Sequence, residues 1–188
     1  LFNTEMVRAI LDGRKDATRR IVKGFIPDDA VWGYTAFTPK GYISCRGTFA
    51  DGYGEKFFKL PCESGDILYV RETWKKAPNG YYYYEDWQRN DIADVTKWNP
   101  SIHMPKEAAR IWLKVTDVRV ERLQEITEVQ AQAEGCNSGL LTGACTARGQ
   151  FEDLWNSTVK KSDIDRYGWD ANPWVWVIEF ERCEKPTE

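Results

Sequence analysis

The sequence predicts an α+β fold, a small mixed β barrel with about three helices packed outside it, in one domain over residues 1–188. The length of 188 residues suits a single domain. Segments of alternating apolar and polar residues outnumber segments with helical spacing, and the two kinds do not alternate as a doubly wound sheet requires. Apolar residues make up 42% of the chain, which is enough for a full core and excludes wholesale disorder.

Three segments have the apolar spacing of helices. Residues 2–11 place four apolar side chains on one face, and residues 151–159 place three there. Residues 127–133 form a shorter helix in this interpretation. Thr127 is its expected N-cap, and Gly135 is expected to end it.

Strands are expected at Ile21–Val22 and over residues 67–74, 81–84, 109–120 and 174–180. The fourth of these is expected to bend or bulge near Asp117. Residues 24–62 are rich in Gly, Pro, Thr and aromatics, and we interpret them as an inserted hairpin or long excursion. Residues 86–107 and 136–147 are expected to be loops.

Composition and motifs exclude several classes of protein. The net charge of −3 and the pI of about 5.4 argue against a broad basic surface for duplex DNA. Apolar runs are far shorter than the roughly 20 residues of a membrane span, so no membrane partner is expected. There is no Walker-type loop and no Gly-x-Gly-x-x-Gly, which argues against nucleotide-triphosphate hydrolysis and against a dinucleotide partner.

The cysteines predict neither a metal site nor another cofactor. The chain has five cysteines, no Cys-x-x-Cys and a single histidine, His103. A structural zinc site usually shows paired ligands at short spacing. Reduced thiols in a cytoplasmic protein are the preferred interpretation. Cys45 and Cys62 are the one pair left open as metal ligands.

Residues 12–23 carry a local net charge of +3 in an acidic chain. Cations at the end of a helix suit its dipole, so a solvated helix end is one interpretation. The other interpretation is a pocket for an anion or a nucleotide, because Arg offers planar donors to phosphate and Lys a point charge. The cations are Arg14, Lys15, Arg19, Arg20 and Lys23.

The pattern Gly13-Arg14-Lys15-x-x-Thr18-x-Arg20 resembles the signature that opens ASCH domains of the PUA-like superfamily. Further segments that resemble the family follow in its order, at residues 64–68, 126–135 and 176–180. The resemblance covers residues 1–23 and 63–182, with 24–62 and parts of 75–107 as insertions. It implies a PUA-like pseudo-barrel with a cleft and a link to RNA or modified nucleosides. The insertions look most like ASCH-like proteins of bacteriophages and prophages.

One branch of that family consists of bacterial amidohydrolases that remove acetyl from N4-acetylcytidine. Its Lys, Thr and Glu fall by motif on Lys15, Thr18 and Glu134. Lys15 would then be the base, Thr18 the nucleophile, and Glu134 the acid or orienting group. Lys acts as a base only if burial or neighbouring cations lower its pKa. Asp16 stands where the branch has Thr, and this chain is nearly twice as long, so the substrate could differ.

Other residues are candidates for binding substrate or nucleic acid. Arg14, Arg19 and Arg20 could grip phosphate and supply the positive field that Lys15 needs. Arg71, Glu72 and Trp74 lie near the end of the expected strand 67–74 and are further candidates. For these three, an interior ion pair and core packing are the alternative interpretations.

Four functions stay open from the sequence. The leading one is a nucleoside or RNA pocket protein, with a modified nucleoside or single-stranded RNA as partner; the activity considered for it is that of an amidohydrolase that deacylates N4-acetylcytidine or a related modified base. The second is a non-catalytic reader of RNA or of a modified base. The third is an ASCH-type ribonuclease. The fourth is a phage structural or host-interaction protein, with a protein partner on residues 24–62.

Overall fold

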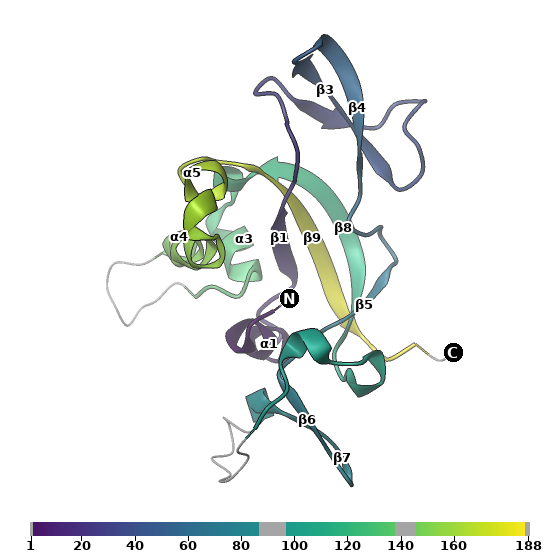
Figure 1. Ribbon diagram of the computed structural model, residues 1–188, viewed down its shortest axis with the longest axis vertical. Coiled ribbons are helices and arrows are strands. Elements are labelled where there is room, and N and C mark those ends of the chain that lie inside the picture. The colour runs from purple at the N-terminus through teal and green to yellow at the C-terminus, as the bar shows by residue number, and fades with distance from the viewer. Residues whose placement is uncertain (1, 87–96, 138–145, 187–188) are drawn as a thin grey trace.

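A curved antiparallel sheet forms the centre of the protein. The computed structural model describes residues 2–86, 97–137 and 146–186 (Figure 1). Its main sheet has the strand order β1-β9-β8-β5, and every pairing in it is antiparallel. The sheet curls into a half-barrel (Figure 1). Because helices accompany this antiparallel sheet, the fold is α+β, as expected. The strands are β1 (Ala17–Ile21), β5 (Ile67–Tyr69), β8 (Trp112–Arg122) and β9 (Trp174–Cys183).

A β-bulge contributes to this curvature. The register between β8 and β9 shifts between Val115 and Asp117, so Thr116 has no opposite residue. An extra residue on one strand bends that strand and increases its twist. The bulge expected near Asp117 is therefore confirmed.

Helices lie outside the sheet, as predicted. In Figure 1, α3, α4 and α5 lie on one side of β1, and α1 lies near the start of that strand. Asn3 caps the first helix, since its side chain accepts a hydrogen bond of 2.8 Å from the amide of Met6. Thr127 caps α3 in the same way, through the amide of Gln130 at 3.2 Å. The helices are α1 (Thr4–Leu11), α3 (Glu128–Ala133), α4 (Ala147–Thr158) and α5 (Ile164–Tyr167), with 3-10 turns at Ser101–His103, Lys106–Ala108, Leu123–Glu125 and Lys161–Asp163.

The excursion predicted over residues 24–62 is a separate three-stranded sheet. Its strands are β2 (Val31–Gly33), β3 (Tyr42–Phe49) and β4 (Gly52–Lys59), in the order β2-β3-β4. It projects from one end of the main sheet, at the top of Figure 1. Trp32 joins it to the main sheet by packing edge-on against Trp174, with ring centroids 5.7 Å apart.

The single strand expected over residues 67–74 is wrong. β5 ends at Tyr69, and β6 (Trp74–Ala77) pairs instead with β7 (Gly80–Tyr83) in a hairpin. The break follows from long-range contacts: Glu72 turns inward to an ion pair with Arg110, at 2.9 Å. A local alternating pattern holds no information about such a partner.

Several boundaries also differ. The strand expected at Ile21–Val22 begins at Ala17, and the helix expected over 151–159 begins at Ala147. The strand expected over 109–120 lies at residues 112–122. Residues 87–96 and 138–145, within two expected loops, lie outside the described part of the chain. Among the described residues, no helix is both long enough and apolar enough to cross a membrane.

Candidate functional site

Lys15 is buried just before β1, and its ammonium is fully bonded. Its Nζ donates to the main-chain oxygens of Ala17 and Glu134, each at 2.8 Å, and to Glu134 Oε2 at 2.6 Å. An ammonium has three N–H donors, so all three are used. The side chains of Lys15 and Glu134 are 0% and 4% exposed. The two residues that the ASCH resemblance singled out 119 positions apart therefore form one buried ion pair.

Two glycines bring these residues together. Gly13 ends α1 with a φ of +71°, and Gly135 ends α3 with a φ of +93°. A Cβ on Gly135 would lie 2.9 Å from the Cβ of Ala9 in α1, which is too close. Only glycine permits both the left-handed backbone and this close approach. The ends of α1 and α3 consequently meet at Lys15.

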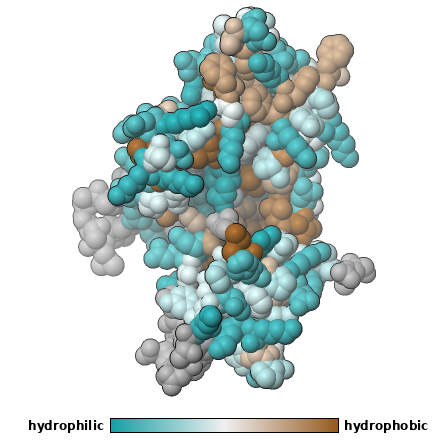
Figure 2. Space-filling model, viewed as in Figure 1, coloured by the Kyte–Doolittle hydropathy of each residue, from teal (hydrophilic) through white to brown (hydrophobic). Residues whose placement is uncertain are grey.

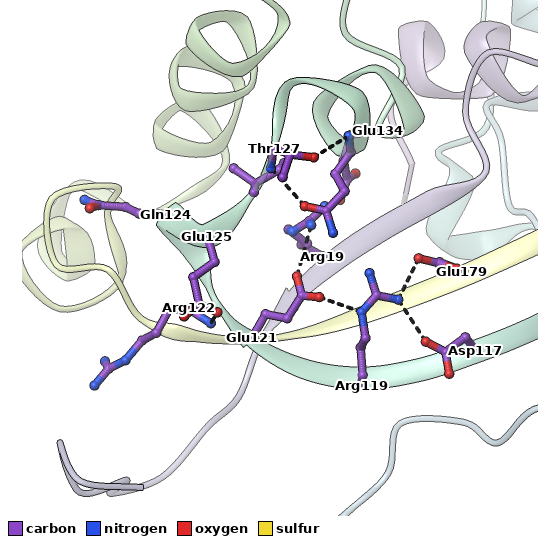
Figure 3. Close-up of polar contacts among 12 residues, drawn as sticks. Arg19, Asp117, Arg119, Glu121, Arg122, Gln124, Glu125, Thr127, Glu134 and Glu179 are labelled. Atoms are coloured by element: carbon purple, nitrogen blue, oxygen red, sulfur yellow. Dashed lines mark hydrogen bonds and ion pairs between the residues drawn. The ribbon is translucent and has the colours of Figure 1, made fainter. Parts of the chain in front are cut away.

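Arg19 extends the ion pair into a cluster. Its Nη1 lies 3.2 Å from Glu134 Oε1, and its Nη2 lies 3.4 Å from Glu121 Oε2 on β8. Figure 3 shows this guanidinium between the two carboxylates, with α3 on one side of it and the sheet on the other. Its Nε is buried and has no hydrogen-bond partner among the described residues. A buried N–H without an acceptor is costly, because no hydrogen bond replaces the one it would make to water.

Burial shifts the proton affinities in this cluster. It lowers the pKa of Lys15, and the neighbouring Glu134 carboxylate offsets only part of that effect. Burial also lowers the pKa of Arg20 and raises the pKa of the Asp16 carboxyl. A Lys whose pKa is lowered gives up its proton more readily than an exposed one, which is a requirement for a general base.

A cavity of about 260 Å³ opens beside the cluster. One wall is polar and consists of Glu134 and four consecutive residues of β1. The opposite wall is largely apolar and belongs to α4. The polar residues are Thr18, Arg19 and Arg20, with Ile21 beside them, and the facing wall includes Phe151, Leu154 and Trp155. Such a pairing of an apolar wall with a few polar groups is typical of small-molecule sites.

The free edge of β1 forms part of the polar wall. Phe180 donates to Asp16 at 2.8 Å and Val22 donates to Trp174 at 3.0 Å, which fixes the alternation of the β1–β9 ladder. By that alternation, the N–H and C=O groups of residues 17, 19 and 21 point away from β9. Lys15 Nζ already covers the outward oxygen of Ala17, and Arg20 Nη1 covers that of Arg19, at 2.9 Å. The outward groups left without such a cover are the N–H groups of residues 17, 19 and 21 and the oxygen of Ile21, so donors outnumber acceptors on this edge.

Thr18 lines the same cavity and is 6% exposed. Its hydroxyl has no hydrogen bond to any side chain or main-chain group in the part of the chain that the structure describes. A second cavity of about 260 Å³ lies on the other side of Arg19, between α3 and the sheet. There Arg119 is bound to Asp117 and Glu179, at 2.8 and 2.6 Å (Figure 3).

The other residues predicted from the sequence do not line the cavity beside Thr18. Arg14 is exposed and donates to Asp12 at 3.2 Å. Arg71 donates to the main-chain oxygen of Ile102 at 3.1 Å. Glu72 accepts two hydrogen bonds of 2.9 Å from Arg110, which is the interior ion pair of the alternative interpretation. Trp74 is buried in the core against Tyr81.

Sequence reasoning missed the apolar wall and Glu121. The spacing of Phe151, Leu154 and Trp155 was visible, but it indicated a core-facing helix. Nothing in the sequence marked Glu121, because its role depends on the β8–β9 pairing. Phe2 was also missed: the Nζ of Lys15 lies 5.8 Å from the centroid of its ring.

The structure gives no support to a metal site at the cysteines. No group of three His, Cys, Asp or Glu residues in the described chain is placed to hold a metal ion. Cys45 and Cys62 are buried free thiols. Burial raises the pKa of each to about 11, which disfavours the thiolate that binds metals.

Fold and site together define an α+β protein whose buried Lys–Glu–Arg cluster borders a small, half-apolar cavity. No protein-family model matches the chain, and no curated protein or solved structure is significantly similar to it.

Proposed function

We propose that the chain is an ASCH-type amidohydrolase that removes the acyl group from a modified cytosine nucleoside such as N4-acetylcytidine. One observation carries the proposal. Thr18, whose hydroxyl has no hydrogen bond within the described chain, and Glu134 line one cavity, and Glu134 is bonded to the buried Lys15. Acyl transfer requires a nucleophile and a group that accepts its proton. In this proposal Thr18 is the nucleophile, and the Lys15–Glu134 pair accepts the proton.

The proposed reaction has two steps. Thr18 Oγ1 attacks the acyl carbon, and its proton passes to the Lys15–Glu134 pair. The carbon–nitrogen bond then breaks, and the pair returns a proton to the exocyclic nitrogen as the cytidine leaves. A water molecule next hydrolyses the acyl ester on Thr18, which releases the carboxylic acid and restores the hydroxyl.

The cavity walls suit a base with carbonyl oxygens. The N–H groups of Arg19 and Ile21 on the outward edge of β1 are donors. Cytosine offers adjacent acceptors at its O2 and N3 atoms, so a wall of donors fits it. The rings of Phe151 and Trp155 supply an apolar surface against which a base can pack.

A non-catalytic reader of a modified base is the second candidate, and one observation favours it. All three N–H groups of the Lys15 ammonium are bonded to oxygen atoms. An ammonium in that state has no lone pair with which to accept a proton. In a reader, the cluster would hold the cavity in shape, and Thr18 would be dispensable.

The test is to incubate the protein with N4-acetylcytidine and follow the formation of cytidine by chromatography. Thr18→Val is the matched variant, because it keeps the shape of the side chain and removes the hydroxyl. Lys15→Ala is the second variant, with circular dichroism to confirm that each protein is folded.

Turnover that is lost in both folded variants supports the amidohydrolase. Binding of N4-acetylcytidine without turnover, unchanged in Thr18→Val, supports the reader instead. If the protein neither binds nor turns over N4-acetylcytidine, both proposals are overturned for this nucleoside. The cleavage of labelled single-stranded RNA by the same protein would then point to a ribonuclease.

A further inference from the structure

The outer edge of β4 lies on the surface and pairs with no other strand of the described residues. In the excursion, β4 pairs with β3 and is the last strand of the three-stranded sheet β2-β3-β4. It carries exposed aromatic side chains among charged ones, since Tyr53 is 74% exposed and Phe57 is 38% exposed. The excursion projects from the main sheet in Figure 1, and Figure 2 shows apolar surface among hydrophilic residues at that end of the molecule.

The register shows which backbone groups face outward from β4. Leu60 donates to the oxygen of Gly41 at 2.9 Å, and Tyr42 lies opposite Lys59. In an antiparallel ladder, hydrogen-bonded pairs alternate, so the even-numbered residues of β4 bond to β3. The N–H and C=O groups of the odd-numbered residues 53, 55, 57 and 59 point away from it.

Four donors and four acceptors at two-residue spacing match another extended strand. Exposed edges of this kind are templates for pairing with a second chain. We propose that the occupant is a second copy of this protein, and that the two β4 strands pair antiparallel about a twofold axis at Phe57. The proposal does not depend on the proposed amidohydrolase function.

The charges along β4 favour this register, because an axis at Phe57 is the one that brings Glu55 opposite Lys59. With the axis at Phe57, Glu55 of each copy lies opposite Lys59 of the other, and the two phenylalanines face each other. An axis at Glu55 would oppose two carboxylates, and an axis at Lys56 would oppose two ammonium groups. Opposite charges across a ladder stabilise it and like charges destabilise it. The aromatic pair adds a contact of the kind that favours pairing between strands.

The register predicts a specific cross-link. Hydrogen-bonded partners in an antiparallel pair have Cα atoms about 5.5 Å apart, which is within the range of a disulfide. Phe57→Cys should therefore form a disulfide-linked dimer under mild oxidation. Glu55→Cys is the matched control, because the two positions 55 lie four residues apart along the paired strands. The unsubstituted chain gives the background from its own cysteines.

Charge reversal tests the same register without cysteines. Sedimentation velocity over a concentration series should show a dimer of the unsubstituted chain. Glu55→Lys should raise the dissociation constant about tenfold, since it turns two attractive pairs into repulsive ones. The double variant Glu55→Lys with Lys59→Glu should restore it.

A monomer at all concentrations, with no cross-link through Phe57→Cys, overturns the proposal. A dimer that cross-links equally through Glu55→Cys, or that is unaffected by charge reversal, overturns the register and the twofold axis at Phe57. None of these results bears on N4-acetylcytidine turnover, which is measured on the same samples.

Discussion

Lys15 and Glu134 are joined twice, because the ammonium of Lys15 donates both to the carboxylate of Glu134 and to its main-chain oxygen. The second carboxylate oxygen of Glu134 is bound to Arg19. The single buried carboxylate of Glu134 therefore forms ion pairs with two buried cations, Lys15 and Arg19. The position of the helix end that carries Glu134 is fixed by the same contacts that organise the proposed site.

Glu134→Gln is expected to destabilise the fold more than Lys15→Met. The first change leaves two cations buried with too little negative charge, and breaking a buried pair in this way costs about 3–5 kcal/mol. The second change leaves Glu134 still bonded to Arg19, so its cost should be smaller. Urea unfolding of both variants measures the difference, and equal losses would contradict the arrangement.

Ile21→Pro is expected to weaken ligand binding while leaving the sheet intact. The N–H of Ile21 points away from β9, and proline is tolerated on an edge strand where that group is not bonded. Loss of one hydrogen bond to the ligand corresponds to roughly a three- to tenfold weaker affinity. Calorimetry with N4-acetylcytidine measures it. Ile21→Ala controls for the lost side chain and should bind more tightly than Ile21→Pro.

The stability of the protein should fall between about pH 9 and pH 11. Burial raises the pKa of the thiols of Cys45, Cys62 and Cys136 from 9.0 to about 11. In that window the unfolded chain releases thiol protons that the folded chain keeps, so a rising pH favours the unfolded state. Each thiol contributes on the order of 2–3 kcal/mol at most.

Urea unfolding from pH 8 to pH 11 under reducing conditions checks this dependence. Cys45→Ala should flatten the decline, because it removes one of the three thiols. An equally steep decline in that variant would show that the Cys45 thiol does not contribute.

Glu128→Ala is expected to loosen α4. The carboxylate of Glu128 on α3 accepts hydrogen bonds from the amides of Ala147 and Arg148, at 2.6 and 3.1 Å. It therefore satisfies the first turn of α4 and places a negative charge there, which suits the helix dipole. The free energy of unfolding should drop by about 0.5–2 kcal/mol. Glu152→Ala, a change on α4 itself, is the control and should change the free energy of unfolding little.

Local features of the fold could be predicted because their causes lie within a few residues. The cap at Thr127 and the helix end at Gly135 are examples, as is the bulge near Asp117. The break after Tyr69 could not be predicted, because it depends on an ion pair between residues far apart in the chain. The spacing of apolar and polar residues along the chain does not indicate which distant residues form ion pairs.

Some features of the candidate site could likewise be predicted from the sequence, and others could not. The cations of residues 14–20 form a cluster in the sequence, but no pattern along the chain indicates that Arg14 lies outside the cavity and Arg19 in its wall. The donors on the edge of β1 could not be foreseen, since an edge is a property of the sheet. The wall around Phe151 was visible only as a face of a helix, without its position opposite β1.

The pairing of β1 has a consequence for how the protein folds. The only strand partner of β1 in the described chain is β9, which follows almost all of the other elements. During synthesis, β1 must wait for β9 to emerge before its ladder can form. Contacts this distant along the chain are slow to form. The cavity should therefore be among the last features to form during folding. A chain whose synthesis has stopped before β9 should lack this cavity.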